Sequence, residues 1–154
     1  MDRRGFIGAL AGGLLAAPLT VDAQQGKVFR VGFLTAYFNN ADAPLFDSFR
    51  LGMRELGYEE GRNIAYQTRW SEGRLERLPA LAAELVALKL DVMLAASTPA
   101  VLAAKKATQS IPILMTSVED PVGTGLVDSL ARPGGNITGN TTIIGEMAGK
   151  RLEL

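Results

Sequence analysis

The chain has 154 residues, 47% of them hydrophobic, which is enough for one folded domain with an apolar core. Its 16 basic and 16 acidic residues balance, so no electrostatic footprint points to nucleic acid or to an anionic membrane. The absence of Cys and His excludes thiol chemistry, disulfides, Cys/His metal sites and any nucleophile activated by His. We therefore expect no cofactor and no nucleic-acid partner.

Residues 1–23 are predicted to be an export signal peptide. Arg3 and Arg4 form a positive start, residues 7–19 are apolar and uncharged, and cleavage is expected after Ala23. The arginine pair resembles a twin-arginine export motif, with the general secretory route as the alternative. A membrane anchor is disfavoured because the apolar stretch is shorter than the roughly 20 residues that a span requires. The mature chain is expected in the periplasm, without stable membrane insertion.

The first half of the mature chain alternates strands and helices. Residues 28–34 are a short β-branched and apolar run, which predicts a strand. Residues 45–56 place apolar side chains at helical spacing. Residues 63–70 alternate, which predicts a strand with one exposed face. Helical spacing returns over 75–88, where Pro79 is compatible with the first turn.

The second half continues the alternation. Residues 91–95, an apolar run after Asp91, predict a strand covered on both faces, and a helix is expected over 97–109. Another buried strand is predicted over 112–116, then a short helix over 125–131 and a β-rich stretch over 136–144. This order predicts an α/β fold, with a doubly wound, Rossmann-like parallel sheet and helices on both faces.

The loops that follow the strands are the places where chemistry is expected, because ligands of open α/β sheets lie beyond the carboxyl ends of the strands. Three loops qualify: residues 35–40, 96–99 and 117–121. A helix N-terminus at 97–100 favours an anionic group such as a carboxylate. Asp120 could accept from an ammonium group, and Tyr37 could stack on a ring. The set suits a zwitterion and holds no nucleophile–base pair.

Each of these residues also has a simpler structural interpretation. Ser97 and Thr98 would cap their own helix. Asp120, which precedes Pro121, would set a turn, and Tyr37 would belong to the core. The residues alone leave both interpretations open.

Several stretches of sequence carry a family resemblance. They are residues 3–6 (RRGF), 49–58 (FRLGMRELGY), 60–64 (EGRNI), 97–100 (STPA), 120–127 (DPVGTGLV) and 130–139 (LARPGGNITG). Together they resemble the substrate-binding proteins of ABC transporters, in the group that includes tryptophan- and tyrosine-binding members. The last two stretches are the most diagnostic, and the resemblance extends over essentially the whole chain.

The resemblance implies one lobe of a two-lobed, type I periplasmic binding protein. It places the N-terminal ligand-binding lobe at 24–135, with a crossing segment and the start of a truncated second lobe at 136–154. Such a protein captures a small solute between its lobes for the membrane permease of an ABC importer. The expected solute is an amino acid, and aromatic amino acids are the first candidates. Because the pattern over 145–154 looks like an unfinished helix, we expect a fragment.

The resemblance also assigns roles to residues of the three loops. Ser97 and Thr98 would hold a ligand carboxylate, Asp120 its amino group, and Tyr37 or Asn39 would flank it. The complete expected binding set is Thr35, Tyr37, Asn39, Ser97, Thr98, Ala100 and Asp120. One alternative is a truncated, non-binding protein that serves only as a partner surface. An enzyme on the same fold is a weaker alternative, because the chain lacks His, Cys and a cofactor loop.

Overall fold

A computed structural model describes residues 26–37 and 39–142. The predicted signal peptide and the predicted unfinished helix at 145–154 lie outside these residues. The elements follow in chain order: β1 (Phe29–Thr35), α1 (Asn39–Glu55), β2 (Ile64–Trp70), the 3-10 turn η1 (Leu75–Arg77), α2 (Leu78–Ala87), β3 (Val92–Ala96), α3 (Thr98–Ala107), β4 (Ile113–Val118) and β5 (Ile137–Thr141).

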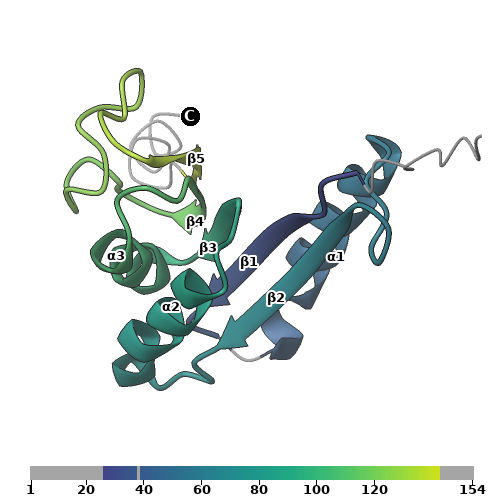
Figure 1. Cartoon of the computed structure of the whole chain (residues 1–154). Helices are drawn as coiled ribbons and strands as arrows, with labels where there is room; N and C mark the ends of the chain where they lie inside the picture. Colours follow the sequence, from purple (N-terminus) through teal and green to yellow (C-terminus); the bar gives the residue numbers. More distant parts are fainter. Residues whose placement is uncertain (1–25, 38, 143–154) are drawn as a thin grey trace, which may run out of the picture.

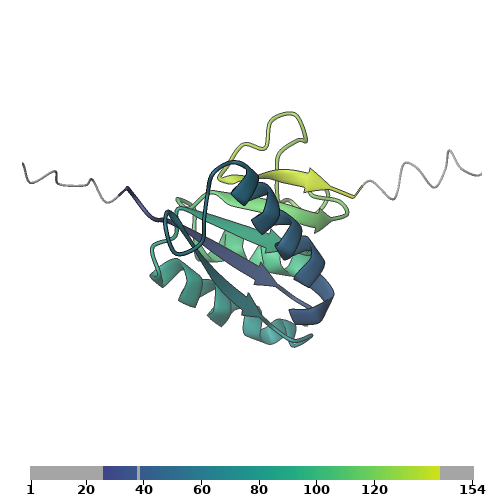
Figure 2. The ribbon, with the colours of Figure 1, turned by 90° about the vertical axis from the view of Figure 1, so that its right-hand side faces the viewer.

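The strands form one parallel sheet in the order β2-β1-β3-β4-β5. Helix α1 covers one face of the sheet, and α2 and α3 cover the other (Figures 1 and 2). This arrangement confirms the predicted doubly wound α/β fold. Because all strands run the same way, their carboxyl ends gather at one edge of the sheet.

The larger part of the core lies between the sheet and the pair α2 and α3. Leu34, Met93 and Ile113 of the strands meet Leu85 of α2 and Val101 of α3, and all five side chains are fully buried. Burial of each such side chain contributes about 1.5–3 kcal/mol. This layer fixes the position of α3, whose N-terminus lies at the carboxyl edge of the sheet.

The opposite face is packed with aromatic rings. Phe33 of β1 stacks on Phe46 of α1 with ring centroids 4.9 Å apart, and Tyr66 of β2 meets Phe46 edge-on at 5.5 Å. The Arg50 guanidinium lies over the Tyr66 ring at 5.5 Å. Burial raises the pKa of the Tyr66 hydroxyl above its usual value. These contacts attach α1 to both strands beneath it.

Most element boundaries agree with the sequence to within one or two residues. Helix α1 is the main exception, because it begins at Asn39, well before the predicted start at Leu45. The predicted start rests on the apolar spacing, which begins at Leu45, whereas the helix extends through Pro44 to the more polar residues before it.

The predicted short helix over 125–131 is wrong. The segment forms a series of turns, in which the Leu126 and Val127 amides both donate to the Pro121 carbonyl. Gly125 has a φ of +68°, which interrupts any helix. The Lys105 ammonium donates to the Gly125 carbonyl at 2.5 Å, so a side chain replaces the helical hydrogen bond there. Leu126 and Val127 are buried, so the segment contributes to the core from a loop and not from a helix.

Candidate functional site

The carboxyl ends of β1, β3 and β4 lie side by side at one edge of the sheet. Thr35 pairs in register with Ala96, and Ala96 pairs with Thr116. The Ser97 amide then donates to the Thr116 carbonyl at 3.0 Å, which extends the ladder one residue beyond β3. The register therefore brings Thr35 and Ser97, two of the predicted binding residues, onto adjacent chain ends.

Ser97 has an unusual environment. The residue is 3% exposed, and its Oγ is buried. Among the described residues, this oxygen finds no hydrogen-bond partner. Leaving such a hydroxyl unpaired costs about 1–3 kcal/mol. The prediction that this hydroxyl caps α3 is wrong, because Ser97 makes no side-chain cap hydrogen bond. Its dihedral angles of φ 87° and ψ 149° differ from those of an ordinary cap.

The first turn of α3 lies directly after Ser97. The first hydrogen bond of the helix runs from the Val101 amide to the Ser97 carbonyl, at 3.1 Å. The amides of Thr98 and Ala100 belong to the turn that has no intrahelical acceptor, and Pro99 carries no amide proton. The Ala100 side chain is fully buried in the core, so a contribution from this residue would come from its backbone. Together these groups offer a carboxylate two amides and a hydroxyl.

Backbone strain concentrates near the same edge. Of the four described non-glycine residues with positive φ, Glu72 follows β2, Ser97 follows β3 and Ser117 lies at the end of β4. The fourth, Lys89, precedes β3 at the opposite edge. At Ser117 the pairing of β4 with β5 shifts its register, as a bulge would cause. Such strain persists where the surrounding structure imposes it, and it clusters at functional sites.

The predicted residues after β1 lie close to this edge. Thr35 is fully buried, and its Oγ1 accepts from the Tyr37 amide at 3.2 Å. Tyr37 is 52% exposed, so the alternative that it belongs to the core is wrong. Asn39 begins α1. The loop therefore presents an exposed aromatic ring beside the hydroxyl-lined chain ends.

Asp120 occupies a different position in the fold. It is exposed and lies beyond the end of β4, where its Oδ1 accepts from the Gly123 amide at 2.8 Å. The Thr124 hydroxyl donates to the Asp120 carbonyl at 2.6 Å. These bonds form a turn, as the simpler interpretation of this residue expected. The register does not bring Asp120 onto the chain ends that carry Thr35 and Ser97.

Two buried polar residues at this edge were not predicted from the sequence. Thr116 supplies the carbonyl that holds the Ser97 amide. Ser71, which is fully buried, follows β2 and donates from its hydroxyl to the Ala36 carbonyl at 2.9 Å. The rule that places ligands beyond the carboxyl ends of strands applies equally to β2, so the signal for Ser71 was present.

Within the described residues, no group of three or more acidic, His or Cys side chains is arranged to hold a metal ion. No helix of the described chain has both the length and the apolar character needed to cross a membrane.

Comparison with known proteins identifies the family. Residues 41–154 match the family of ABC transporter substrate binding proteins. The chain belongs to this family. A curated substrate-binding relative, the tyrosine-binding protein of Clostridioides difficile (strain R20291), is 39% identical over 106 residues, which cover 69% of this chain and 30% of the relative.

Solved structures of substrate-binding proteins share the fold. The ligand-free, open structure of a substrate-binding protein with adhesive properties from Clostridium difficile aligns with a TM-score of 0.75 and 30% identity, over 81% of this chain and 42% of that one. The ABC domain in complex with L-Trp from Streptococcus pneumonia aligns with a TM-score of 0.69 and 28% identity, over 75% and 39%. The chain therefore spans less than half the length of the relatives it matches.

Proposed function

We propose that this chain supplies the ligand-binding lobe of an extracytoplasmic solute-binding protein that serves an ABC importer, and that its solute is an aromatic amino acid. The proposal rests on family membership together with the geometry of the carboxyl edge. Delivery of the solute to a membrane permease, rather than catalysis, is the role that follows from this family.

The observation that carries the proposal is the unpartnered, buried hydroxyl of Ser97 at the start of α3. The residue is 3% exposed, its hydroxyl makes no hydrogen bond among the described residues, and its backbone is strained, so we assign this hydroxyl no structural role within the lobe. A ligand carboxylate would accept from this hydroxyl and from the amides of Thr98 and Ala100. The partial positive charge of the helix N-terminus would favour the same anion.

The aromatic character of the solute is supported by two observations. The curated relative is named a tyrosine-binding protein, and one structural neighbour was solved in complex with L-Trp. In this chain, Tyr37 offers a half-exposed ring beside the buried Thr35, suited to stacking on an aromatic side chain. Asp120 and Asn39 are proposed as further contacts, the former to the ligand ammonium group.

The organisation of the full protein is part of the same proposal. Residues 1–23 would direct export and be removed, which would place the mature protein in the periplasm. Residues 24–135 would form the first lobe, and 136–154 would cross to a second lobe that completes the binding cleft. Closure of two lobes around a ligand supplies contacts that one lobe lacks, so we expect this chain alone to bind weakly.

A titration followed by nuclear magnetic resonance tests the proposal and tolerates weak binding. We expect L-Trp and L-Tyr to shift the amide signals of Ser97, Thr98 and Ala100. Tryptamine, which lacks the carboxylate, should leave these signals unchanged, whereas indole-3-propionate, which lacks the ammonium group, should still shift them. Equal shifts with tryptamine and L-Trp, or no shifts at this edge with either amino acid, would refute the proposed carboxylate site.

A further inference from the structure

The loop that follows β2 is joined to the exit of β1 by three hydrogen bonds. The Ser71 amide donates to the Thr35 carbonyl at 3.1 Å, and the Gly73 amide donates to the Ala36 carbonyl at 2.9 Å. The Ser71 hydroxyl donates to the same Ala36 carbonyl at 2.9 Å. Two successive carbonyls of the β1 exit are thus both occupied by the segment 71–73, which fixes the orientation of their peptide planes.

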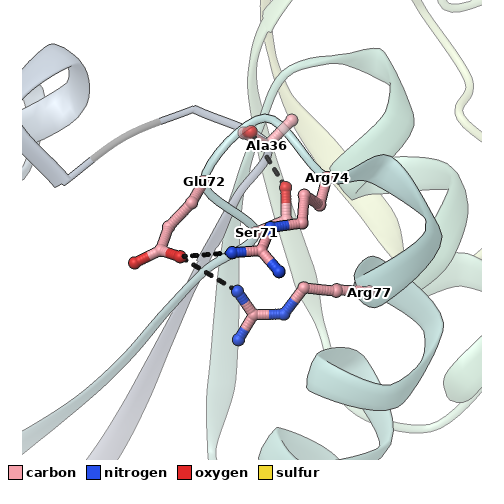
Figure 3. A network of polar contacts seen from close by, with 5 residues as sticks. All are labelled: Ala36, Ser71, Glu72, Arg74 and Arg77. Carbon is pink, nitrogen blue, oxygen red and sulfur yellow. Dashed lines mark hydrogen bonds and ion pairs between the residues drawn. The ribbon is translucent and has the colours of Figure 1, made fainter.

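This segment is itself held in an unfavourable conformation. Glu72, between the two donating residues, has a φ of 57°, a region that side chains other than glycine rarely adopt. One oxygen of its carboxylate, Oε2, faces two guanidinium groups, at 3.1 Å from Arg77 and 3.9 Å from Arg74 (Figure 3). Both arginines belong to the turn that leads into α2. The ion pairs therefore connect the strained residue to a helix that is anchored in the core.

The location of this network relates it to ligand binding. Ser71 is fully buried, so its hydroxyl is not simply a solvated group on a surface loop. The carbonyl that it holds belongs to Ala36, which lies between Thr35 and Tyr37. The Tyr37 amide in turn donates to Thr35 Oγ1. Any rotation of the Ala36 peptide would move the exposed ring of Tyr37 relative to Ser97 on the adjacent strand end.

We propose that Ser71 is a positioning residue, which holds the Thr35–Tyr37 turn in one conformation through the Ala36 carbonyl. Glu72, held by Arg74 and Arg77, maintains the backbone that aims the Ser71 and Gly73 donors at this carbonyl. The relevance of this brace to solute capture rests on the proposed function. The brace orders the aromatic side of the site before the ligand arrives, which reduces the entropy lost on binding.

Amide hydrogen exchange on the full chain tests the brace without any ligand. Ser71→Ala removes one hydroxyl from the network and no packing volume beyond it. We expect the Gly73 and Tyr37 amides to exchange roughly 10-fold faster in this variant, the change that corresponds to the loss of one hydrogen bond of ordinary strength. Val101, in the core helix α3, should accelerate less than these two amides, because only the global loss of stability reaches it. Ser71→Thr retains the hydroxyl and should restore slow exchange at both amides.

A matched control separates positioning from general stability. Thr108→Val removes another buried hydroxyl, which accepts from the Ile111 amide at 3.1 Å at the opposite edge of the sheet. Both Ser71→Ala and Thr108→Val should lower the melting temperature. Ser71→Ala alone should weaken the L-Trp-induced shifts of the Ser97 amide, by a factor of about 3–10 in apparent affinity.

The outcomes separate the brace from the proposed function. Unchanged exchange at Gly73 and Tyr37 in Ser71→Ala would overturn the brace, whatever the chain binds. Faster exchange with undiminished affinity for L-Trp would overturn its role in positioning. A wild-type chain that fails to bind L-Trp or L-Tyr would refute the proposed function, while faster exchange in Ser71→Ala would still support the brace.

Discussion

Replacement of Ser97 by glycine should make the protein more stable and a poorer binder. The residue stands at φ 87° and ψ 149°, close to a region that is nearly exclusive to glycine. Its buried hydroxyl makes no hydrogen bond. Both features raise the free energy of the folded state, and Ser97→Gly removes both.

The expected change in stability combines four contributions. Relief of the backbone strain should gain of order 1–3 kcal/mol, and removal of the unpaired buried hydroxyl about 1–3 kcal/mol. The greater freedom of glycine in the unfolded chain opposes these gains by about 0.5–1 kcal/mol. Because the serine side chain also fills space in the folded lobe, we expect a net gain of about 2 kcal/mol, or roughly 4–8 °C in melting temperature for a chain of this size.

Ser97→Ala is the matched control, because it removes the hydroxyl but keeps the strain. Urea denaturation should rank the free energies of unfolding as Gly above Ala above wild type. Both variants should lose affinity for L-Trp in the same titration, since each lacks the proposed carboxylate donor. If wild type is the most stable of the three, the hydroxyl has a structural partner and the reasoning fails. If Ser97→Ala binds L-Trp as tightly as wild type does, the hydroxyl has no role in capture.

Two further predictions concern the scaffold. Gly139→Ala should destabilise the protein by about 3 kcal/mol or more, because the φ of Gly139 is 141° and an added Cβ would overlap the Met115 carbonyl. Gly52→Ala, where an added Cβ meets open space on a helix, should stabilise the protein by about 0.5–1 kcal/mol. Urea denaturation measures both changes, and a tolerated Gly139→Ala would contradict the described β4–β5 pairing. The Lys27 ammonium, 2.5 Å from Asp91, holds the pKa of the Asp91 carboxyl below its ordinary value of 3.8. The ionised Asp91 therefore contributes its full stabilisation of the fold above pH 3.8, and this contribution is lost as the pH falls through the lower pKa of the folded state. Asp91→Asn should therefore flatten the dependence of unfolding free energy on pH between about pH 5 and pH 2, and an unchanged acid limb would contradict the role of this ion pair.

The sheet and most of its helices could be predicted because local patterns and tertiary packing agree. Residues 92–95 are a continuous apolar run, and β3 is covered by helices on both faces, as such a run requires. The segment 125–131 shows where this inference fails. Leu126 and Val127 are buried but Leu130 is exposed, and glycine geometry and a distant lysine determine the local structure. The Lys105–Gly125 contact joins residues 20 positions apart, which local spacing does not reveal.

The candidate site was predicted in part. The sequence located the loops at the carboxyl edge, and the structure places Thr35 and Ser97 on adjacent chain ends there. It did not reveal that Ser97 leaves its hydroxyl unpaired, because this depends on a backbone dihedral angle imposed by the neighbouring strand. The place of Ser71 after β2 was visible in the sequence, but its partner was not, because Ala36 lies 35 positions earlier and meets it only once β1 and β2 pair.

The positions where local rules fail are also the positions that point to function. A serine before Thr-Pro is an ordinary helix start, and a hydrogen bond from its side chain would have completed that pattern. Glycine would have satisfied the backbone at this position without strain. The chain has neither arrangement, and the same edge carries strained backbone at Glu72 and Ser117. Such departures are expected where a residue is kept for a contact made outside the lobe. In the proposed function a ligand carboxylate at the N-terminus of α3 would supply that contact, so measurement of Ser97 variants bears on the fold and the function at once.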